Sequence, residues 1–414
     1  MVGAGAAGLA TAAFLSRRRP DRTVVVLESA RKPGAKILVS GGSRCNVTNV
    51  AVTERDFWGG SRSSIRQVLR AFDATAARHY FEGLGVPLHE EHDGKLFPNS
   101  NRSRDVLEAL LRELAAAGAT LCADHRVASV GHDGHRFIVT TSHGAFDAAQ
   151  LVVATGGRAL PRSGSDGAGY GLARAFGHTI VDTTPALAPL TLGPGSPHAA
   201  LSGVSHQAEL SVWVDGRVEE RVTGSLLWTH FGISGPVALN VSRLWARARL
   251  DQRTAAVTMN VAPGRGFDDI DQRLTAQYRD RPRAAVGTLL DAWVPEAVGA
   301  ALLASVGIER MRSAAQVDRD ARRRLAHALH AWPLAVTDTR GYTFAEATAG
   351  GVSLAEIDTR TMESKKQRGL YFVGEVLDVD GRLGGYNFQW AWSSAWVAAR
   401  ALAANGGSEG SRKP

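Results

Sequence analysis

The stretch MVGAGAAGLATAAFLSRRR (residues 1–19) decides how this chain folds. Gly3, Gly5 and Gly8 form a GxGxxG pattern that leads into residues rich in alanine and leucine. In this pattern the first glycine permits a tight turn, the second lets a diphosphate approach the backbone, and the third lets a helix pack closely on a strand. The opening residues therefore predict a turn and a helix that bind a dinucleotide.

The residues that follow strengthen this prediction. Thr23–Ser29 (TVVVLES) reads as a short buried strand of a parallel sheet. Glu28 follows Gly8 by 20 residues, the place where an acidic side chain accepts hydrogen bonds from the adenosine ribose. A carboxylate there repels a 2′-phosphate, which disfavours NADP at this site.

The strand before Gly3 is expected to be unusual. Such a strand needs about five residues, whereas only Met1 and Val2 precede the glycine. We therefore expect either a start further upstream or a shortened central strand.

A second glycine-rich region lies near the other end of the chain. Gly369–Glu375 (GLYFVGE) reads as a buried strand that ends in a glycine and an acid, which places a carboxylate near a second hydroxyl-bearing part of a long cofactor. FAD has such a part, the ribityl chain, and is therefore favoured over NAD. The loop Gly381–Phe388 precedes an apolar helix (Gln389–Leu402), and its backbone N–H groups can face the pyrimidine edge of a flavin.

The pattern between these two regions indicates several further segments. Short alternating strands with glycine turns predict a β-meander from Arg126 to Ala154, and Leu210, Val212 and Val214 alternate with polar residues before an Asp-Gly turn. Residues 266–333 lack this alternation and read as helical. We expect an α/β chain with these parts: residues 1–188 and 336–403 as the two parts of an FAD-binding domain, 189–262 as an inserted β-rich domain, 263–335 as a helical domain, and 404–414 as a disordered tail.

Composition and charge exclude several classes of protein. Two cysteines, Cys45 and Cys122, exclude a disulfide scaffold and a multi-cysteine metal site, and they fit a reducing cytoplasm. No apolar run reaches the roughly 20 residues of a membrane span. The net charge of the chain is +8, but its arginines are dispersed along the sequence. Such a distribution more often reflects the base composition of the genome than a nucleic-acid-binding surface, where basic residues cluster. We therefore expect a small-molecule substrate, and we expect neither nucleic acid nor membrane as a partner.

Several motifs together resemble the bacterial YhiN-like (BaiN-type) flavoproteins. They are GAGAAGL (3–9), GAKILVSGGSRCNVTN (34–49), THFGISGP (229–236), residues 349–357, TMESK (361–365) and GLYFVGEVLDVDGRLGGYNFQWAWSSA (369–395). Members are described as NAD(P)/FAD-dependent oxidoreductases, some as aminoacetone oxidases, and some resemble bile-acid reductases. Ser43 departs from the family's SGGGRCN pattern, where a glycine stands in its place.

The resemblance implies a two-part, glutathione-reductase-like FAD domain with an inserted β-barrel-like domain and a small helical domain. It implies FAD contacts from Lys36, Gly41 and Gly42, and backbone contacts from Val127 to the adenine. The full set of expected cofactor contacts comprises Gly3, Gly5, Ala6, Ala7, Gly8, Glu28, Ser29, Lys36, Gly41, Gly42, Asn46, Val127, Thr155, Gly156, Gly157, Gly374, Glu375, Gly384, Gly385, Tyr386 and Asn387.

Three residues are candidates for the chemistry, each with a structural alternative. Arg44 can bind an anionic or carbonyl-bearing substrate, or it caps loop carbonyls. His230 can deliver a proton from a loop of the inserted domain, or it holds a structural hydrogen bond. Tyr386 is a second proton donor or a packing residue. Cys45 reads as a small buried packing residue, because Cys122 is too distant in sequence for a flavin disulfide pair.

These features predict an FAD-dependent oxidoreductase in which hydride passes through the flavin N5. The direction stays open: NAD(P)H, as a transient donor, drives reduction of an activated C=C or C=O, or a small amine or hydroxy compound is oxidised. Two other functions are weighed against this one. One is a basic nucleic-acid or partner-binding protein with structural FAD, and the other is an NAD-dependent dehydrogenase.

Overall fold

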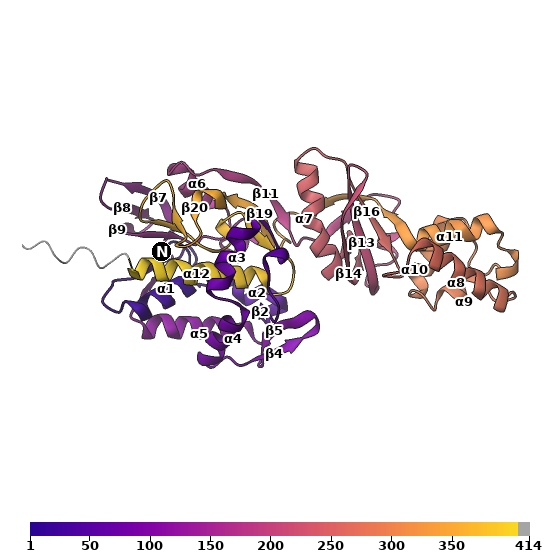
Figure 1. Cartoon of the computed structure of the whole chain (residues 1–414), viewed down its shortest axis with the longest axis horizontal. Coiled ribbons are helices and arrows are strands. Elements are labelled where there is room, and N and C mark those ends of the chain that lie inside the picture. Colours follow the sequence, from indigo (N-terminus) through magenta and orange to yellow (C-terminus); the bar gives the residue numbers. More distant parts are fainter. Residues whose placement is uncertain (405–414) are drawn as a thin grey trace, which may run out of the picture. The chain divides into compact units, whose positions relative to one another are not determined.

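The computed structural model describes residues 1–404, and its chain divides into two units (Figure 1). The first unit consists of Met1–Thr183 together with the segment from Glu346 onward, and the second is Thr184–Ala345. The predicted tail, 404–414, lies outside the described residues except for Ala404.

A largely parallel sheet forms the centre of the first unit, and Val2 joins its two halves. Val2 makes parallel bridges to Leu27 on one side and to Val153 on the other, so this single residue fills the central strand position. The N–H of Val2 donates to Val152 O at 2.8 Å. The order across the sheet is β6 (Thr120–Cys122), β1 (Val25–Leu27), Val2, β10 (Leu151–Val153), β22 (Leu370–Phe372), β21 (Glu363–Ser364) and β20 (Ile357–Asp358).

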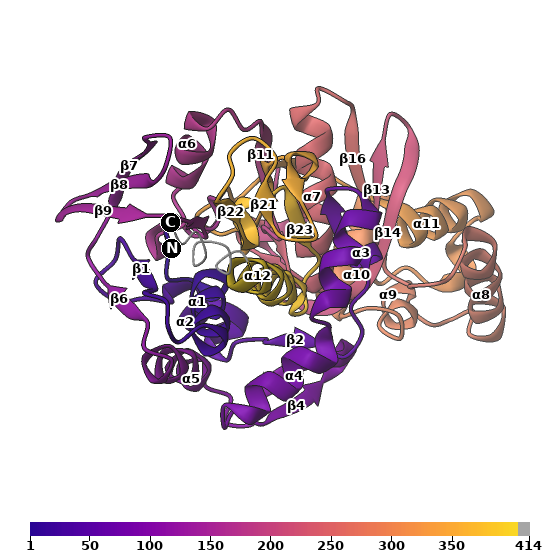
Figure 2. The same ribbon diagram turned by 60° about the vertical axis from the view of Figure 1, so that its left-hand side comes forward.

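Two helices from opposite ends of the sequence, α1 (Ala6–Arg18) and α12 (Tyr386–Ala404), pack against each other in this unit (Figure 2). The rings of Phe14 and Trp396 meet edge to face with centres 5.1 Å apart. Small residues make the close approach possible, since seven of the ten buried residues of α1 are alanine, glycine, serine or threonine. Further helices of the unit are α2 (Ala35–Ser43), α3 (Arg62–Ala71), α4 (Ala74–Gly83), α5 (Ser103–Ala116) and α6 (Ala168–Ala175).

Smaller sheets complete the first unit. The predicted meander is present as β7 (Val127–His132), β8 (Phe137–Thr141) and β9 (Gly144–Ala148), each antiparallel to the next. The others are β4 (Leu88–Glu91) and β2 (Thr48–Asn49) on either side of β5 (Lys95–Pro98), β3 (Phe57–Gly59) with β23 (Val379–Gly381), and β11 (Ile180–Ala186) with β19 (Ala347–Val352).

The second unit is built on a seven-stranded sheet whose paired strands are antiparallel. Its order is β17 (Trp332–Leu334), β16 (Ala255–Asn260), β13 (Ser205–Val214), β14 (Arg217–Thr229), β15 (Gly232–Ser234), β12 (Leu190–Leu192) and β18 (Val336–Thr339). The two edge strands are separated in the chain by Ala335 alone, so the sheet must curl until its edges approach each other. Within residues 1–404 no ladder joins β17 to β18, so a closed barrel is not shown.

Turn chemistry and helix packing explain the remainder of this unit. Asp215 and Gly216 both have positive φ (49° and 77°), which is the geometry of a tight hairpin between β13 and β14. Helix α7 (Pro236–Leu250) packs on those two strands. The segment predicted to be helical holds α8 (Phe267–Asp280), α9 (Val286–Leu290), α10 (Glu296–Ser305) and α11 (Arg319–Ala331). Because β18 pairs with β12, residues 336–345 group with the second unit and not, as the sequence pattern predicts, with the closing segment of the first unit.

Within residues 1–404, no helix is both long enough and apolar enough to cross a lipid bilayer.

Candidate cofactor site

The opening glycine turn leaves an open place at the start of α1. Gly3 has φ 101°, and a Cβ there would lie 2.6 Å from the carbonyl oxygen of Ala154. A Cβ on Gly8 would lie 1.9 Å from the oxygen of Gly3. Within the described part of the chain, by contrast, a Cβ on Gly5 would meet no atom within 4 Å, and no side chain caps the helix N-terminus that begins there. This open space beside the N–H groups of Ala6 and Ala7 fits a diphosphate.

Glu28 lies at the end of β1 and is held toward this turn. Its carboxylate accepts hydrogen bonds from Ala4 N at 2.8 Å and Ala30 N at 2.9 Å, and Ser29 Oγ lies 3.2 Å from the same group. Only 9% of the residue is exposed. Because an ionised carboxylate has about four lone-pair positions, Glu28 retains capacity to accept from a ribose hydroxyl.

The closing segment of the chain meets the opening helix at Gly374. This glycine has φ 73°, and a Cβ on it would lie 2.6 Å from the Cβ of Ala7. Its N–H donates to Ser394 Oγ at 3.0 Å, and its oxygen accepts from Trp390 Nε1 at 3.2 Å. The two glycine-rich regions therefore meet at the start of α1, which is compatible with the prediction of a single long cofactor.

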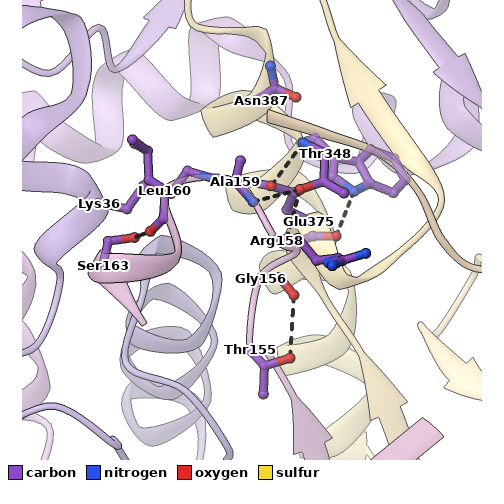
Figure 3. Close-up of polar contacts among 12 residues, drawn as sticks. Lys36, Thr155, Gly156, Arg158, Ala159, Leu160, Ser163, Thr348, Glu375 and Asn387 are labelled. Atoms are coloured by element: carbon purple, nitrogen blue, oxygen red, sulfur yellow. Dashed lines mark hydrogen bonds and ion pairs between the residues drawn. The ribbon is translucent and has the colours of Figure 1, made fainter. Parts of the chain in front are cut away.

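Glu375 is the centre of a side-chain network (Figure 3). One carboxylate oxygen pairs with Lys36 Nζ at 2.5 Å, and the other accepts from Thr348 N at 3.1 Å. Thr348 Oγ1 in turn accepts from Arg158 N at 2.8 Å and from Ala159 N at 3.0 Å. Four segments far apart in the sequence thus converge on two side chains.

The close packing of this network explains the glycine that follows Thr155 and Gly156. A Cβ on Gly157 would lie 2.4 Å from Thr348 Oγ1 and 2.9 Å from a carboxylate oxygen of Glu375. Sequence reasoning missed Thr348, because a threonine inside a buried strand of small residues carries no motif. Its position directly before Ala349 and the Gly350-Gly351 pair was the only available signal.

The glycine loop before α12 is fixed by three asparagines. Asn387 accepts from Gly381 N at 2.8 Å and donates to Gly381 O at 2.9 Å. Asn49 donates to Gly384 O at 3.1 Å, and a Cβ on Gly385 would lie 2.5 Å from Thr48 O. In the amide orientation that pairs donors with acceptors, Asn46 accepts from Gly385 N. The loop is thereby held at the N-terminus of α12.

The loop within α2 contains consecutive residues in the left-handed region. Gly41, Gly42 and Ser43 have φ values of 55°, 68° and 66°. This conformation suits glycine and strains a serine, which explains why the departure from the family pattern at Ser43 matters. The open space at Gly42, where a Cβ would meet nothing within 4 Å, is compatible with a close ligand.

Arg44 and Cys45 follow this loop. The Arg44 guanidinium pairs with Glu91 at 2.6 Å and lies 4.1 Å from the ring centre of Phe97. This hydrogen bond lowers the pKa of the Glu91 carboxyl. Arg44 thus pairs with a carboxylate, and its role as a substrate contact stays a prediction. Burial raises the pKa of the Cys45 thiol to about 12, as expected of a packing residue.

The remaining candidates lie in different surroundings. Tyr386 is 1% exposed, its Oη accepts from Arg382 at 2.6 Å, and burial raises its pKa. Val127 begins β7, at an irregularity in the pairing with β8. His230 is exposed in the turn between β14 and β15 of the second unit. Its role as a proton donor stays a prediction.

Comparison with known proteins gives one family and several full-length relatives. The family model described as "HI0933-like protein Rossmann domain" matches residues 1–401. A ribosomal RNA dihydrouridine synthase of Haemophilus influenzae is 32% identical, with 97% of both chains covered. One of Escherichia coli is 33% identical, covering 98% of this chain and 97% of the relative. A 3-dehydro-bile acid delta(4,6)-reductase of Clostridium scindens is 31% identical, covering 97% and 98%.

The family model matches nearly the whole chain, and the matched residues include the open glycine turn, Glu28 and the Glu375 network. These residues fit the two ends of an FAD molecule. The chain therefore belongs to the HI0933-like Rossmann family of FAD-dependent oxidoreductases.

Proposed function

We propose that this protein is a flavin-dependent reductase that uses NAD(P)H to reduce a C=C bond conjugated to a carbonyl group, and that its substrate is a uridine of ribosomal RNA. The observation that carries the proposal is the full-length similarity to enzymes named for such reductions. Dihydrouridine is uridine with its ring C=C bond reduced, and a 3-dehydro-bile acid with delta(4,6) unsaturation has its double bonds conjugated to the 3-oxo group.

Both substrates are therefore reduced by the same chemical step, the addition of a hydride and a proton across a conjugated C=C bond. A hydride adds to the double-bond carbon that lies farther from the carbonyl group, and a proton adds to the double-bond carbon that lies nearer to it. The balance is one NAD(P)H and one proton consumed, with one NAD(P)⁺ and one saturated C–C bond formed. FAD, when bound, supplies the hydride at N5. This shared chemistry favours the reductase direction over amine oxidation.

The residues of the chain supply binding and orientation. The turn at Gly5 and the start of α1 would hold the diphosphate, and Glu28 would accept from the ribose. Glu375, fixed by Lys36 and Thr348, would face the ribityl part. The N-terminus of α12, behind Gly384 and Gly385, would stabilise negative charge on the ring.

RNA as substrate reverses the expectation drawn from composition. The dispersed arginines argued against a nucleic-acid partner, but two of the relatives are named as enzymes that act on ribosomal RNA. A net charge of +8 is compatible with a polyanionic substrate. The steroid enone is the second candidate, on the strength of the Clostridium relative.

The test is an anaerobic two-step assay on the holoenzyme. NADH or NADPH should bleach the flavin, and addition of an unmodified ribosomal RNA transcript should restore its colour. Mass analysis of the digested RNA should then show a nucleoside heavier than uridine by two hydrogens. If a 3-oxo-4,6-diene steroid restores the flavin colour and RNA does not, the substrate is the steroid enone rather than RNA. Failure of both compounds, with a flavin that NAD(P)H bleaches, would overturn the proposal.

A further inference from the structure

The second unit carries an aromatic and cationic cluster on its surface. Arg340 lies between two phenylalanine rings, with its guanidinium carbon 4.2 Å from the centre of Phe231 and 3.6 Å from that of Phe344. His230 packs nearly perpendicular to Phe231, with ring centres 5.1 Å apart. We call these four residues the Arg340 cluster.

Neighbouring strands of one sheet hold the cluster in place. Phe231 lies in the turn between β14 and β15, and its oxygen accepts from Leu192 N at 3.1 Å. Arg340 directly follows β18, and its N–H donates to Pro189 O at 2.9 Å. Because β12 pairs with both β15 and β18, the two turns are fixed relative to each other. Phe344 follows in a turn closed by its N–H to Gly341 O at 3.2 Å.

The cluster presents unused binding capacity. Phe344 is 45% exposed, and His230 is exposed. In the described chain no carboxylate forms an ion pair with Arg340, and its guanidinium has no hydrogen-bond acceptor. Asp338, the nearest acid in sequence, instead accepts from Thr339 N at 2.7 Å. An arginine that served only to join two turns would be expected to use some of its five N–H donors on protein acceptors.

We propose that the Arg340 cluster binds the RNA substrate, with a nucleobase stacked on the outer face of Phe344 and the guanidinium of Arg340 on a neighbouring phosphate. This inference rests on the proposed function. Single-stranded RNA is bound in this manner by exposed aromatic rings and arginine planes. An enzyme that modifies a base must also take that base out of its helical stack, so a stacking surface has a direct use.

The experiment compares Phe344→Ala and Arg340→Gln with the wild-type holoenzyme. Binding of a fluorescent single-stranded RNA containing uridine is measured by anisotropy at several salt concentrations. We expect Phe344→Ala to weaken binding about 5- to 150-fold. We expect Arg340→Gln to reduce the slope of log K against log salt by about 0.7, the value for one phosphate contact on a single strand. Phe344→Trp keeps a stacking ring and should retain binding.

A matched control is Arg249→Gln, because Arg249 also lies over an aromatic ring, 5.9 Å from the centre of Trp245 in the same unit. It should bind RNA as the wild type does. Bleaching of the flavin by NAD(P)H should be unchanged in every variant, while KM for RNA rises in Phe344→Ala and Arg340→Gln.

The outcomes separate this inference from the proposed function. If the wild type reduces RNA, and both variants bind and reduce it equally well, the Arg340 cluster is not the RNA surface. If the variants also lose bleaching by NAD(P)H, the cluster is structural and the inference is overturned. If the wild type bleaches with NAD(P)H but neither binds nor reduces RNA, the proposed substrate fails and the inference falls with it.

Discussion

The two ends of the cofactor site are built in different ways. Around Gly5 the described residues offer backbone groups: among residues 1–404 no side chain caps the start of α1, and the position of a Cβ on Gly5 is empty. Around Glu375 the site is a network: Lys36 Nζ and Thr348 N fix the Glu375 carboxylate, and the Thr348 hydroxyl accepts from two further backbone N–H groups. Substitutions that add a side chain should therefore disturb the site around Gly5. Substitutions that remove a polar side-chain group should disturb the site around Glu375.

The largest effect is expected from adding one methyl group at the first end. Gly8→Ala places a Cβ 1.9 Å from the oxygen of Gly3, and backbone atoms cannot move aside cheaply. We expect the free energy of unfolding to fall by about 3 kcal/mol or more, as measured by urea denaturation of the apoprotein.

Gly5→Ala is the matched control, because the same methyl group enters open space. We expect unfolding to change by less than about 0.5 kcal/mol. FAD affinity should fall about 10- to 150-fold as hydrogen bonds to the charged diphosphate are lost. Unchanged FAD binding in this variant would show that the diphosphate does not approach Gly5.

The next effect concerns the ion pair at the second end. Lys36→Met and Glu375→Gln each leave a partly buried partner behind, since the two side chains are 24% and 16% exposed. A double-mutant cycle on unfolding should give a coupling energy of about 1–3 kcal/mol. Strictly additive effects would mean that the two groups do not stabilise each other.

Thr348→Val should lower the free energy of unfolding by a similar amount, about 1–3 kcal/mol, because it leaves the N–H groups of Arg158 and Ala159 without the Thr348 hydroxyl as acceptor. Thr348→Ser retains the hydroxyl, so its FAD affinity should stay within a few fold of the wild type, whereas that of Thr348→Val should be lower. Equal behaviour of the valine and serine variants would show that the hydroxyl has no part in the site.

The smallest effect is expected at Ser43, where φ is 66°. Ser43→Gly removes the strain of the left-handed conformation but adds freedom to the unfolded chain. We expect a net stabilisation of about 0.5–1 kcal/mol, visible as a higher midpoint in thermal unfolding. A destabilised variant would show that the serine side chain makes a compensating contact.

Local patterns in the sequence predicted much of the fold. The buried strands at β1, β10 and β22, the meander and the Asp215-Gly216 hairpin follow from hydrophobic periodicity and turn chemistry, which act over a few residues. A shortened central strand before Gly3 was one of two alternatives that the sequence left open, because a single residue such as Val2 carries no periodicity, and Val2 bridges both neighbouring strands. The curl of the second sheet depends on pairing between β12 and β18, more than a hundred residues apart.

The candidate site shows the same division. The GxGxxG turn and Glu28 were predicted because their spacing is fixed by one strand–helix unit. The pairing of Lys36 with Glu375 joins residues 339 positions apart, and Thr348 has no motif, so neither contact was visible in the sequence. For Arg44 the sequence left a substrate contact and a structural role open. The structure gives it Glu91 and Phe97 as partners, from strands whose proximity no local pattern indicates.

The most direct test of the account is to identify and count the compound released when the purified, FAD-reconstituted protein is denatured. One FAD per chain, seen by its mass and its visible spectrum, is the predicted result, because only FAD reaches from Gly5 to Glu375 with both a diphosphate and a ribityl chain. Release of NAD, or no retained flavin after reconstitution, would contradict the claim that the two glycine-rich regions hold one long flavin cofactor.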